Sequence, residues 1–152
     1  MEIFLLTAEN RQEAAELFAS VFTGEPWGDD WSDREQLDRY LADLMDGPAS
    51  LSLGLRQDGR LIALSLGSIR HYWSGTVYCV DEFCVAREAQ GQGIGTRFLT
   101  AVEKEAARRG AAALFLQTDR QMPAFAFYGK NGYRELGSHV SMKKTLERSE
   151  TK

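Results

Sequence analysis

The chain has 152 residues, a length that suits one domain with a sizeable buried core. Its 43% hydrophobic and 26% charged residues are typical of a globular protein and exclude a disordered or fibrous one. The net charge of -4 argues against a nucleic-acid partner, because proteins that bind phosphate backbones usually carry a basic face.

The start of the chain and its cysteines give no sign of export or of a membrane. No apolar run approaches the roughly 20 residues that cross a bilayer, and residues 1–6 do not form a signal segment. We therefore expect a cytoplasmic protein with no membrane partner. Cys79 and Cys84 lie five residues apart in one apolar run, a spacing that fits neither a metal knuckle nor a disulfide framework. We expect two buried thiols and no metal.

The first third of the chain predicts one strand and two helices. Residues 1–7 are typical of a strand. Apolar residues then recur at helical spacing over 10–22 and again over 32–45, and each stretch opens on a capping-box pattern, with Asn10 and Ser32 in the capping position. Gly and Pro residues break the pattern between the two helices.

The middle of the chain predicts three consecutive strands. Residues 50–57 and 60–70 are joined through Asp58-Gly59, the strongest short hairpin signal. A third strand follows over residues 76–85. A meander of this kind favours neighbouring antiparallel strands.

The remaining residues predict helices over 93–109 and 123–130, a buried strand over 111–118, and two last strands that end at Met142. Because three strands precede the central helix, the order differs from the strict alternation of a doubly wound sheet. We predict an α/β fold in which helices flank a single mixed sheet.

Three glycines, Gly91, Gly93 and Gly95, lie between a predicted strand and a predicted helix. A helix that follows a glycine-rich turn offers unpaired N–H groups and the positive end of its dipole, a combination that binds phosphate. The sequence lacks the Gly-Lys-Ser/Thr of a Walker loop, and Thr96 or Phe98 stands where a dinucleotide fingerprint needs its third glycine. The loop therefore predicts an anionic cofactor of another class.

Gln90, Gly93 and Gly95 match the pattern Q/R-x-x-G-x-G/A, and the segment "PAFAFYGKNGY" follows about thirty residues later. With these two motifs the chain resembles the GNAT superfamily of acetyl-CoA-dependent N-acetyltransferases, from its first strand to Met142. The resemblance implies a single domain over residues 1–146 with a loose tail at 147–152. It also implies a mixed, mostly antiparallel sheet of six to seven strands, about four helices, and a splay between the fourth and fifth strands.

The same resemblance implies that acetyl-CoA is the cosubstrate and that no metal takes part. The diphosphate of CoA would lie on the backbone amides of the glycine loop, and its pantetheine arm would lie beside the strand that ends at Val85. Gln121 stands where the family often has an asparagine that contacts this arm. The cofactor-binding residues expected in this way are Phe83, Cys84, Val85, Gln90, Gly91, Gln92, Gly93, Ile94, Gly95, Thr96 and Gln121.

An amine attacks a thioester only when it is neutral, so a general base must remove a proton from the ammonium form. Glu82 and Asp81 are the candidate bases, with Glu82 favoured. Neighbouring residues of a strand point to opposite faces, but a bulge would change which of the two reaches the substrate. Tyr128 matches the general-acid tyrosine of the family, which protonates the departing thiolate.

The acceptor site is expected near the break between the first two helices, where acidic residues are concentrated. Aromatic rings and carboxylates there would hold a cation. The candidate acceptor-binding residues are Glu25, Trp27, Asp30, Trp31 and Tyr72. We expect acetylation of a primary amine on a small cationic acceptor, of the aminoglycoside or polyamine kind, in a ternary complex.

Three alternatives remain open at this point. The acceptor would instead be a protein amine, or the chain would be a non-catalytic acyl-CoA sensor, or its loop would bind a nucleotide. The sequence is compatible with a monomer or a homodimer.

Overall fold

The computed structural model describes residues 1–148, so residues 149–152 of the expected tail lie outside the described part. The chain divides into two compact units, which meet between Thr118 and Asp119 in the sequence. The first unit contains the β-sheet and the first three α-helices, and the second contains one short helix.

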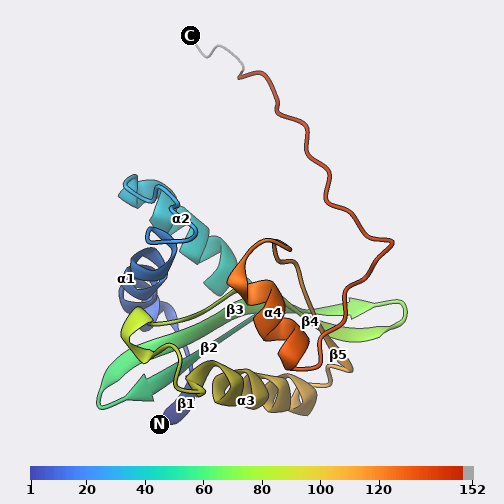
Figure 1. Cartoon of the computed structure of the whole chain (residues 1–152), viewed down its shortest axis with the longest axis horizontal. Coiled ribbons are helices and arrows are strands. Elements are labelled where there is room, and N and C mark those ends of the chain that lie inside the picture. The colour runs from blue at the N-terminus through green and yellow to red at the C-terminus, as the bar shows by residue number, and fades with distance from the viewer. Residues whose placement is uncertain (149–152) are drawn as a thin grey trace. The chain divides into compact units, whose positions relative to one another are not determined.

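One five-stranded sheet runs through the first unit in the order β1-β2-β3-β4-β5 (Figure 1). Its first four strands are antiparallel, and β5 is parallel to β4. The strands are β1 (Glu2–Leu5), β2 (Ser50–Gln57), β3 (Arg60–Tyr72), β4 (Gly75–Val85) and β5 (Ala113–Leu116). The predicted mixed α/β fold with a mostly antiparallel sheet is confirmed.

Helices cover both faces of this sheet. The helices of the first unit are α1 (Arg11–Phe22), α2 (Arg34–Met45) and α3 (Ile94–Arg108), with two short 3-10 turns, η1 (Ala8–Asn10) and η2 (Arg87–Ala89). Figure 1 shows α1 and α2 (blue) on one side of the sheet and α3 (olive) on the other. Side chains such as Phe18 and Leu41 on one face and Phe98 on the other are almost fully buried. Burial of each such side chain stabilises the fold by about 1.5–3 kcal/mol.

Local sequence explains where the helices and the first hairpin begin. The carboxylate of Asp33 accepts a hydrogen bond from the backbone N–H of Gln36 at 3.1 Å, so Asp33 caps α2 one residue after the predicted Ser32. Asp58 and Gly59 both have positive φ, at 52° and 77°, as the tight turn between β2 and β3 requires. The predicted hairpin is therefore confirmed.

The second unit contains α4 (Pro123–Lys130), and its remaining described residues form no strand. The prediction of six to seven strands is therefore wrong: the sheet of the described residues has five. The segment expected to form two last strands turns at Gly132, and its apolar side chains Val140 and Met142 are 80% and 91% exposed. A strand persists only where a neighbouring strand pairs with its backbone and one of its faces is buried, and the described residues of this segment form no ladder.

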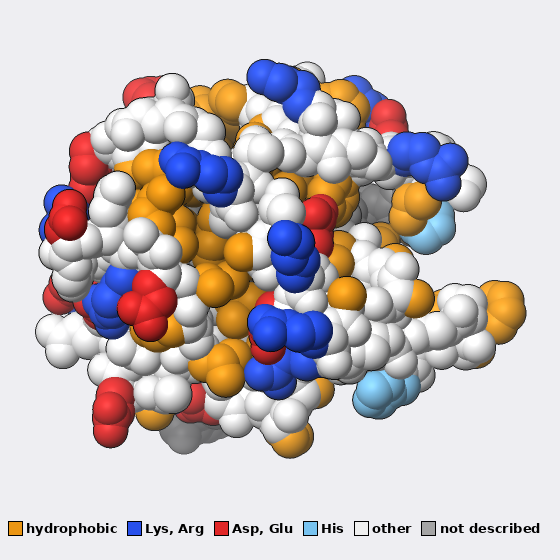
Figure 2. Space-filling model, turned by 90° about the horizontal axis from the view of Figure 1, so that it is seen from below, with side chains coloured by type: hydrophobic (Ala, Val, Ile, Leu, Met, Phe, Trp, Pro, Cys, Tyr) orange, Lys and Arg blue, Asp and Glu red, His pale blue; other side chains and the backbone are white. Residues whose placement is uncertain are grey.

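Within residues 1–148, no helix is long and apolar enough to cross a membrane. Acidic and basic side chains lie next to one another at several places on the face drawn in Figure 2. The surface ion pairs include Arg11–Asp46 and Arg60–Glu88.

Candidate active site

A β-bulge in β4 decides where the two candidate base residues point. Leu66 of β3 pairs with Glu82 and Gly67 pairs with Val80, so Asp81 is the extra residue. Because directly paired residues share a face of the sheet, the bulge places Val80 and Glu82 on opposite faces. Gly67 permits this arrangement, since a Cβ atom there would overlap the carbonyl oxygen of Cys79.

Glu82 lies on the face that α2 covers, where its carboxylate meets Tyr40. The Tyr40 hydroxyl donates a hydrogen bond to Glu82 Oε1 at 2.8 Å. Burial raises the pKa of Glu82 to about 7, although the Tyr40 hydrogen bond lowers it and the charge of Asp81 raises it further. A carboxyl with this pKa is ionised in half of the molecules at neutral pH, which suits a general base.

Aromatic rings form the wall beside this carboxylate. Trp31 stacks on Tyr40 with ring centroids 5.4 Å apart and planes 13° apart. Phe18 contacts both rings, at centroid distances of 5.3 and 5.9 Å. The Trp31 indole N–H is buried and has no hydrogen-bond partner in residues 1–148. Burial of Glu82 in this part of the protein is the main cause of its raised pKa.

Asp81 has a different environment. Its side chain is exposed, and partial burial raises its pKa while the nearby Arg70 guanidinium lowers it. The bulge therefore separates two adjacent acids into a half-buried carboxyl that bonds to Tyr40 and an exposed carboxyl near an arginine.

The glycine loop has the bare backbone that the sequence predicted. Gly93, the residue before α3, has φ 77°, and Gly91 has φ 75°, both in the left-handed region. No side chain caps α3, and no acceptor within residues 1–148 pairs with the N–H groups of Gly91 to Thr96. A Cβ atom added at Gly91 or Gly93 would meet no other atom within 4 Å. The loop thus presents open, unpaired amides to a ligand.

Beside this loop, β4 and β5 separate. Their pairing ends at Val80 and Leu116, so the ladder with β5 does not extend along the last residues of β4. The family resemblance places the splay between the fourth and fifth strands at this point, which stays a prediction. The Gln90 side chain donates to the Val85 carbonyl at 2.9 Å and ties the loop to the end of β4.

The backbone of Val85 faces this opening, whereas that of Cys84 does not. Ala86 donates its N–H to Ile62 of β3 at 2.7 Å, so by alternation Cys84 also faces β3, and Phe83 and Val85 face the opposite way. The Cys84 side chain is buried, and burial raises the pKa of its thiol. Phe83 stacks on Phe98 of α3 at 5.3 Å. Of the three expected pantetheine contacts, Phe83 and Val85 have the backbone direction that the contact requires.

The predicted acceptor residues lie mainly between α1 and α2. Trp27 packs edge-on against Phe22 at 5.2 Å, so both tryptophans of this segment anchor it to α1 or α2. Glu25 and Asp30 are exposed, and the hydrogen bonds from Ser32 lower the pKa of Asp30. Trp31 is linked to Glu82 through Tyr40, on which it stacks.

Tyr72 is not brought together with the others. It ends β3, six pairing positions beyond Leu66, the partner of Glu82. At about 3.3 Å per residue this places it roughly 20 Å from Glu82 along the hairpin.

Sequence reasoning missed two residues. Tyr40 lies on the apolar face of its predicted helix and gives no other signal. Arg87 donates to the carbonyl of Val21, at the end of α1, at 2.9 Å and to that of Glu25 at 2.6 Å. A Cβ atom at Gly24 would overlap its guanidinium. Arg87 thus joins the segment that opens the glycine loop to the segment that carries the predicted acceptor residues.

The second unit carries the two other predicted site residues. Tyr128 lies on α4, is 9% exposed and contacts the rings of Phe127 and Tyr133. Gln121 is exposed, and its backbone N–H donates to Asp119 Oδ1 at 2.8 Å.

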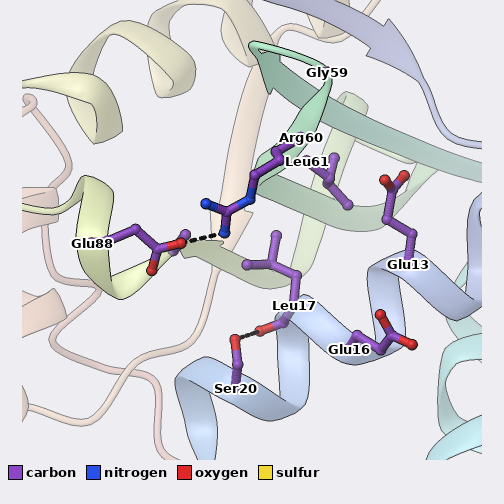
Figure 3. A pocket seen from close by; sticks show the side chains of 9 residues that line it. Glu13, Glu16, Leu17, Ser20, Gly59, Arg60, Leu61 and Glu88 are labelled. Atoms are coloured by element: carbon purple, nitrogen blue, oxygen red, sulfur yellow. Dashed lines mark hydrogen bonds and ion pairs between the residues drawn. The ribbon is translucent and has the colours of Figure 1, made fainter.

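A pocket of about 290 Å³ lies between α1, the β2–β3 turn and η2 (Figure 3). Its polar lining is largely paired: Arg60 contacts Glu88 across it, and Glu13 bonds to Arg56. It includes none of the predicted site residues, so the candidate site rests on the glycine loop, the open end of β4 and Glu82.

Comparisons with known proteins show the family and the fold of the chain. A model of the GNAT acetyltransferase family matches residues 9–133. An IAA acetyltransferase from Azospirillum brasilense is 32% identical to the chain over 117 residues, which span 68% of this chain and 75% of that protein.

Two solved structures share the fold. Ribosomal-protein-alanine N-acetyltransferase from Brucella melitensis biovar Abortus 2308 superposes with a TM-score of 0.76 at 22% identity, over 95% of this chain and 100% of that one. An aminoglycoside N-acetyltransferase in complex with CoA superposes with a TM-score of 0.73 at 16% identity, over 95% of each chain. The family match covers most of the sequence and includes the glycine loop and the helix of Tyr128. The chain therefore belongs to the GNAT acetyltransferase family.

Proposed function

We propose that the protein transfers the acetyl group of acetyl-CoA to a primary amine by direct attack within a ternary complex. The observation that carries this proposal is Glu82: a half-buried carboxyl, with a pKa of about 7, in the part of β4 that lies beyond its ladder with β5. An acid in this setting can take the ammonium proton near neutral pH.

The residues of the first unit fit acetyl-CoA. Unpaired amides from Gly91 to Thr96 suit its diphosphate, and the open space above Gly91 and Gly93 allows close approach. The N–H of Val85 faces the splay and suits a carbonyl oxygen of the pantetheine arm or of the thioester. When bound, acetyl-CoA supplies an activated acyl group with a thiolate leaving group.

The chain's own residues would then perform two proton transfers. Glu82, held by Tyr40, accepts a proton from the acceptor ammonium, directly or through one water. The Tyr128 hydroxyl donates a proton to the departing sulfur, as the family resemblance implies. Asp81, which is exposed, contributes negative potential that favours a cationic acceptor.

The acceptor we propose is a small cationic amine of the aminoglycoside or polyamine kind. Acidic side chains such as Glu25 and Asp30 are exposed beside the aromatic wall, and one structural neighbour acts on aminoglycosides by its name. A second candidate is a protein amine, because another neighbour is named for an alanine of a ribosomal protein.

Thiol release from acetyl-CoA, measured with a panel of polyamines, aminoglycosides and N-terminal peptides, tests this proposal. We expect release that depends on the amine, loss of most of it in Glu82→Gln, and little change in Glu9→Gln, an exposed acid of η1. Tyr128→Phe should keep CoA affinity and slow turnover about tenfold or more. Binding of CoA without release by any amine would instead indicate an acyl-CoA sensor.

The cofactor part of the proposal has its own test. CoA should raise the melting temperature, whereas ATP and NAD should not. Gly93→Val should weaken CoA binding in calorimetry, because a branched side chain at positive φ both strains the loop and crowds the amides. Protection by ATP or NAD alone would contradict the assignment.

A further inference from the structure

A buried hydrogen-bond donor without a partner lies beside the candidate base. Three buried side-chain atoms of residues 1–148 have no hydrogen-bond partner: Arg11 Nε, Trp31 Nε1 and Ser52 Oγ. Of these residues, Trp31 stacks on Tyr40, whose hydroxyl bonds to Glu82. An unpaired buried donor destabilises a protein, and its place next to a candidate active site indicates a role in binding.

Tyr40 sets the distance between this donor and Glu82. Its ring stacks on Trp31 with centroids 5.4 Å apart, and its hydroxyl donates to Glu82 Oε1 at 2.8 Å. The indole and the carboxyl are therefore separated by the size of one aromatic side chain. A small amine spans this gap when it carries an oxygen atom a few bonds from the nitrogen that reacts at Glu82.

The segment that carries Trp31 permits the indole to turn toward such a ligand. Residues 23–33 contain no helix or strand. Their backbone hydrogen bonds include those from Gly28 N–H to the Gly24 carbonyl and from Asp29 N–H to the Phe22 carbonyl, each at 2.9 Å. A rotation of the Trp31 side chain breaks neither of these bonds nor any bond of the sheet, and rotations of this kind are common on binding.

Asp29 brings a negative charge to the same place. It lies two residues before Trp31, its side chain is exposed, and it forms no ion pair within residues 1–148. Besides burial, which is the main cause, the charges of Asp81 and Asp29 raise the pKa of Glu82, so both carboxylates lie near it. Arg70 lies near Asp81. Asp29 is therefore the carboxylate left for a ligand, and its charge favours a second positive group on that ligand.

We propose that the acceptor is a hydroxylated diamine: one amine reacts beside Glu82, a hydroxyl oxygen accepts the Trp31 N–H, and the second ammonium lies against Asp29. This inference rests on the proposed acetyl transfer and narrows its acceptor. Amino sugars and amino alcohols carry all three groups, whereas a protonated polyamine has only donors and leaves the indole N–H unpaired. The N-terminus of a peptide has a carbonyl oxygen, but its backbone supplies no second ammonium.

Thiol release from acetyl-CoA with diaminopropanol and with diaminopropane, which differ by one hydroxyl group, tests the contact of Trp31. Trp31→Phe keeps an aromatic ring and removes the N–H. The ratio of kcat/KM for the hydroxylated amine to that for the plain amine should fall about threefold to tenfold, mainly through KM, as expected for one neutral hydrogen bond. Trp73→Phe removes an exposed indole N–H at the end of β3 and should leave the ratio unchanged. The different basicity of the two amines cancels, because both proteins are given the same pair.

A second variant tests the contact of the other ammonium. In Asp29→Asn the preference for diaminopropanol over aminopropanol, which has one amine, should fall severalfold at low ionic strength. Asp43→Asn, which removes an exposed acid of α2, should keep the preference. Because Asp29 is exposed, this variant tests the site even where melting curves show that Trp31→Phe does not fold.

The outcomes separate this inference from the proposed function. Thiol release with an unchanged ratio in folded Trp31→Phe, or an unchanged preference in Asp29→Asn, overturns the hydroxylated diamine and leaves acetyl transfer in place. Alanine amide that the natural sequence acetylates with a higher kcat/KM than diaminopropanol indicates a peptide acceptor and also overturns the inference. Thiol release with none of the amines refutes the proposed function, and the inference is refuted with it.

Discussion

Removal of the Tyr40 hydroxyl should shift the pH dependence of catalysis upward. Tyr40 donates its hydrogen bond to the ionised form of Glu82, and this bond lowers the pKa of a carboxyl that burial raises to about 7. Tyr40→Phe keeps the ring that stacks on Trp31 and deletes only the donor. Glu82 then stays buried without its partner, so its pKa should rise.

The size of the shift follows from the hydrogen bond. A bond to a charged group contributes about 1.5–3 kcal/mol, and one pKa unit corresponds to about 1.4 kcal/mol. The pKa of Glu82 should therefore rise by about one to two units in Tyr40→Phe. At pH 7 the ionised fraction falls from about one half to between roughly one tenth and one hundredth, and kcat/KM falls about fivefold to fiftyfold.

The assay is the pH profile of kcat/KM for thiol release, measured with one acceptor for all variants. The acceptor's own titration is then common to every profile, and the difference reports the protein group. The rate of Tyr40→Phe should approach that of the natural sequence about two units above pH 7. Glu82→Gln is the reference, since it should lose the acidic limb altogether.

Two results would refute this reasoning. An acidic limb at the same pH in Tyr40→Phe would mean that Tyr40 does not act on the titrating base. A rate lowered by the same factor at every pH would mean that the hydroxyl positions a group and leaves its pKa unchanged.

Three further results should follow from the same contacts. The pKa of Glu82 is about 7 in the native state and 4.5 ordinarily, so between these values the native state keeps a proton that the unfolded state releases. The free energy of unfolding in urea should therefore fall as the pH rises from 4.5 to 7, relative to that of Glu82→Gln. Gly67→Ala should lower the melting temperature and activity more than Gly54→Ala, since the first Cβ atom meets a backbone carbonyl and the second meets only side chains; equal losses would contradict the role of the bulge. Arg87→Ala should raise the KM for the acceptor severalfold and leave the CoA affinity measured by calorimetry unchanged. If CoA affinity falls by the same factor as the KM rises, the substitution acts on folding in general.

Features encoded by neighbouring residues could be predicted from the sequence. The glycine loop, the helix that follows it and the Asp58-Gly59 hairpin depend on φ preferences and capping within a few residues, and the structure has all of them. The ladder between β4 and β5 stops at Val80 because β5 ends at Leu116, whereas the predicted splay of the two strands stays a prediction.

Features that depend on contacts between residues far apart in the chain could not be predicted from the sequence. The contact of Tyr40 with Glu82 spans 42 residues, and that of Arg87 with Val21 spans 66. No local sequence pattern predicts either of these two contacts. The bulge was foreseen only as a possibility, because its position depends on Gly67, a residue of the neighbouring strand.

The strand count failed for a related reason. The residues before Met142 alternate like a strand, but alternation specifies only which side chains share a face. Pairing needs a partner edge, and the described residues of this segment form no ladder. A sequence pattern does not reveal whether that edge is available.

The bond from the Gln90 amide to the Val85 carbonyl has a consequence for solubility. A sheet that opens to bind a ligand also exposes a strand edge. Exposed strand edges can pair with strands of other molecules and so promote aggregation. An incoming strand needs donors and acceptors in alternation, yet the last acceptor here is already occupied. The Val85 N–H can still bind a ligand carbonyl, while the occupied Val85 carbonyl hinders the addition of a further strand at this end.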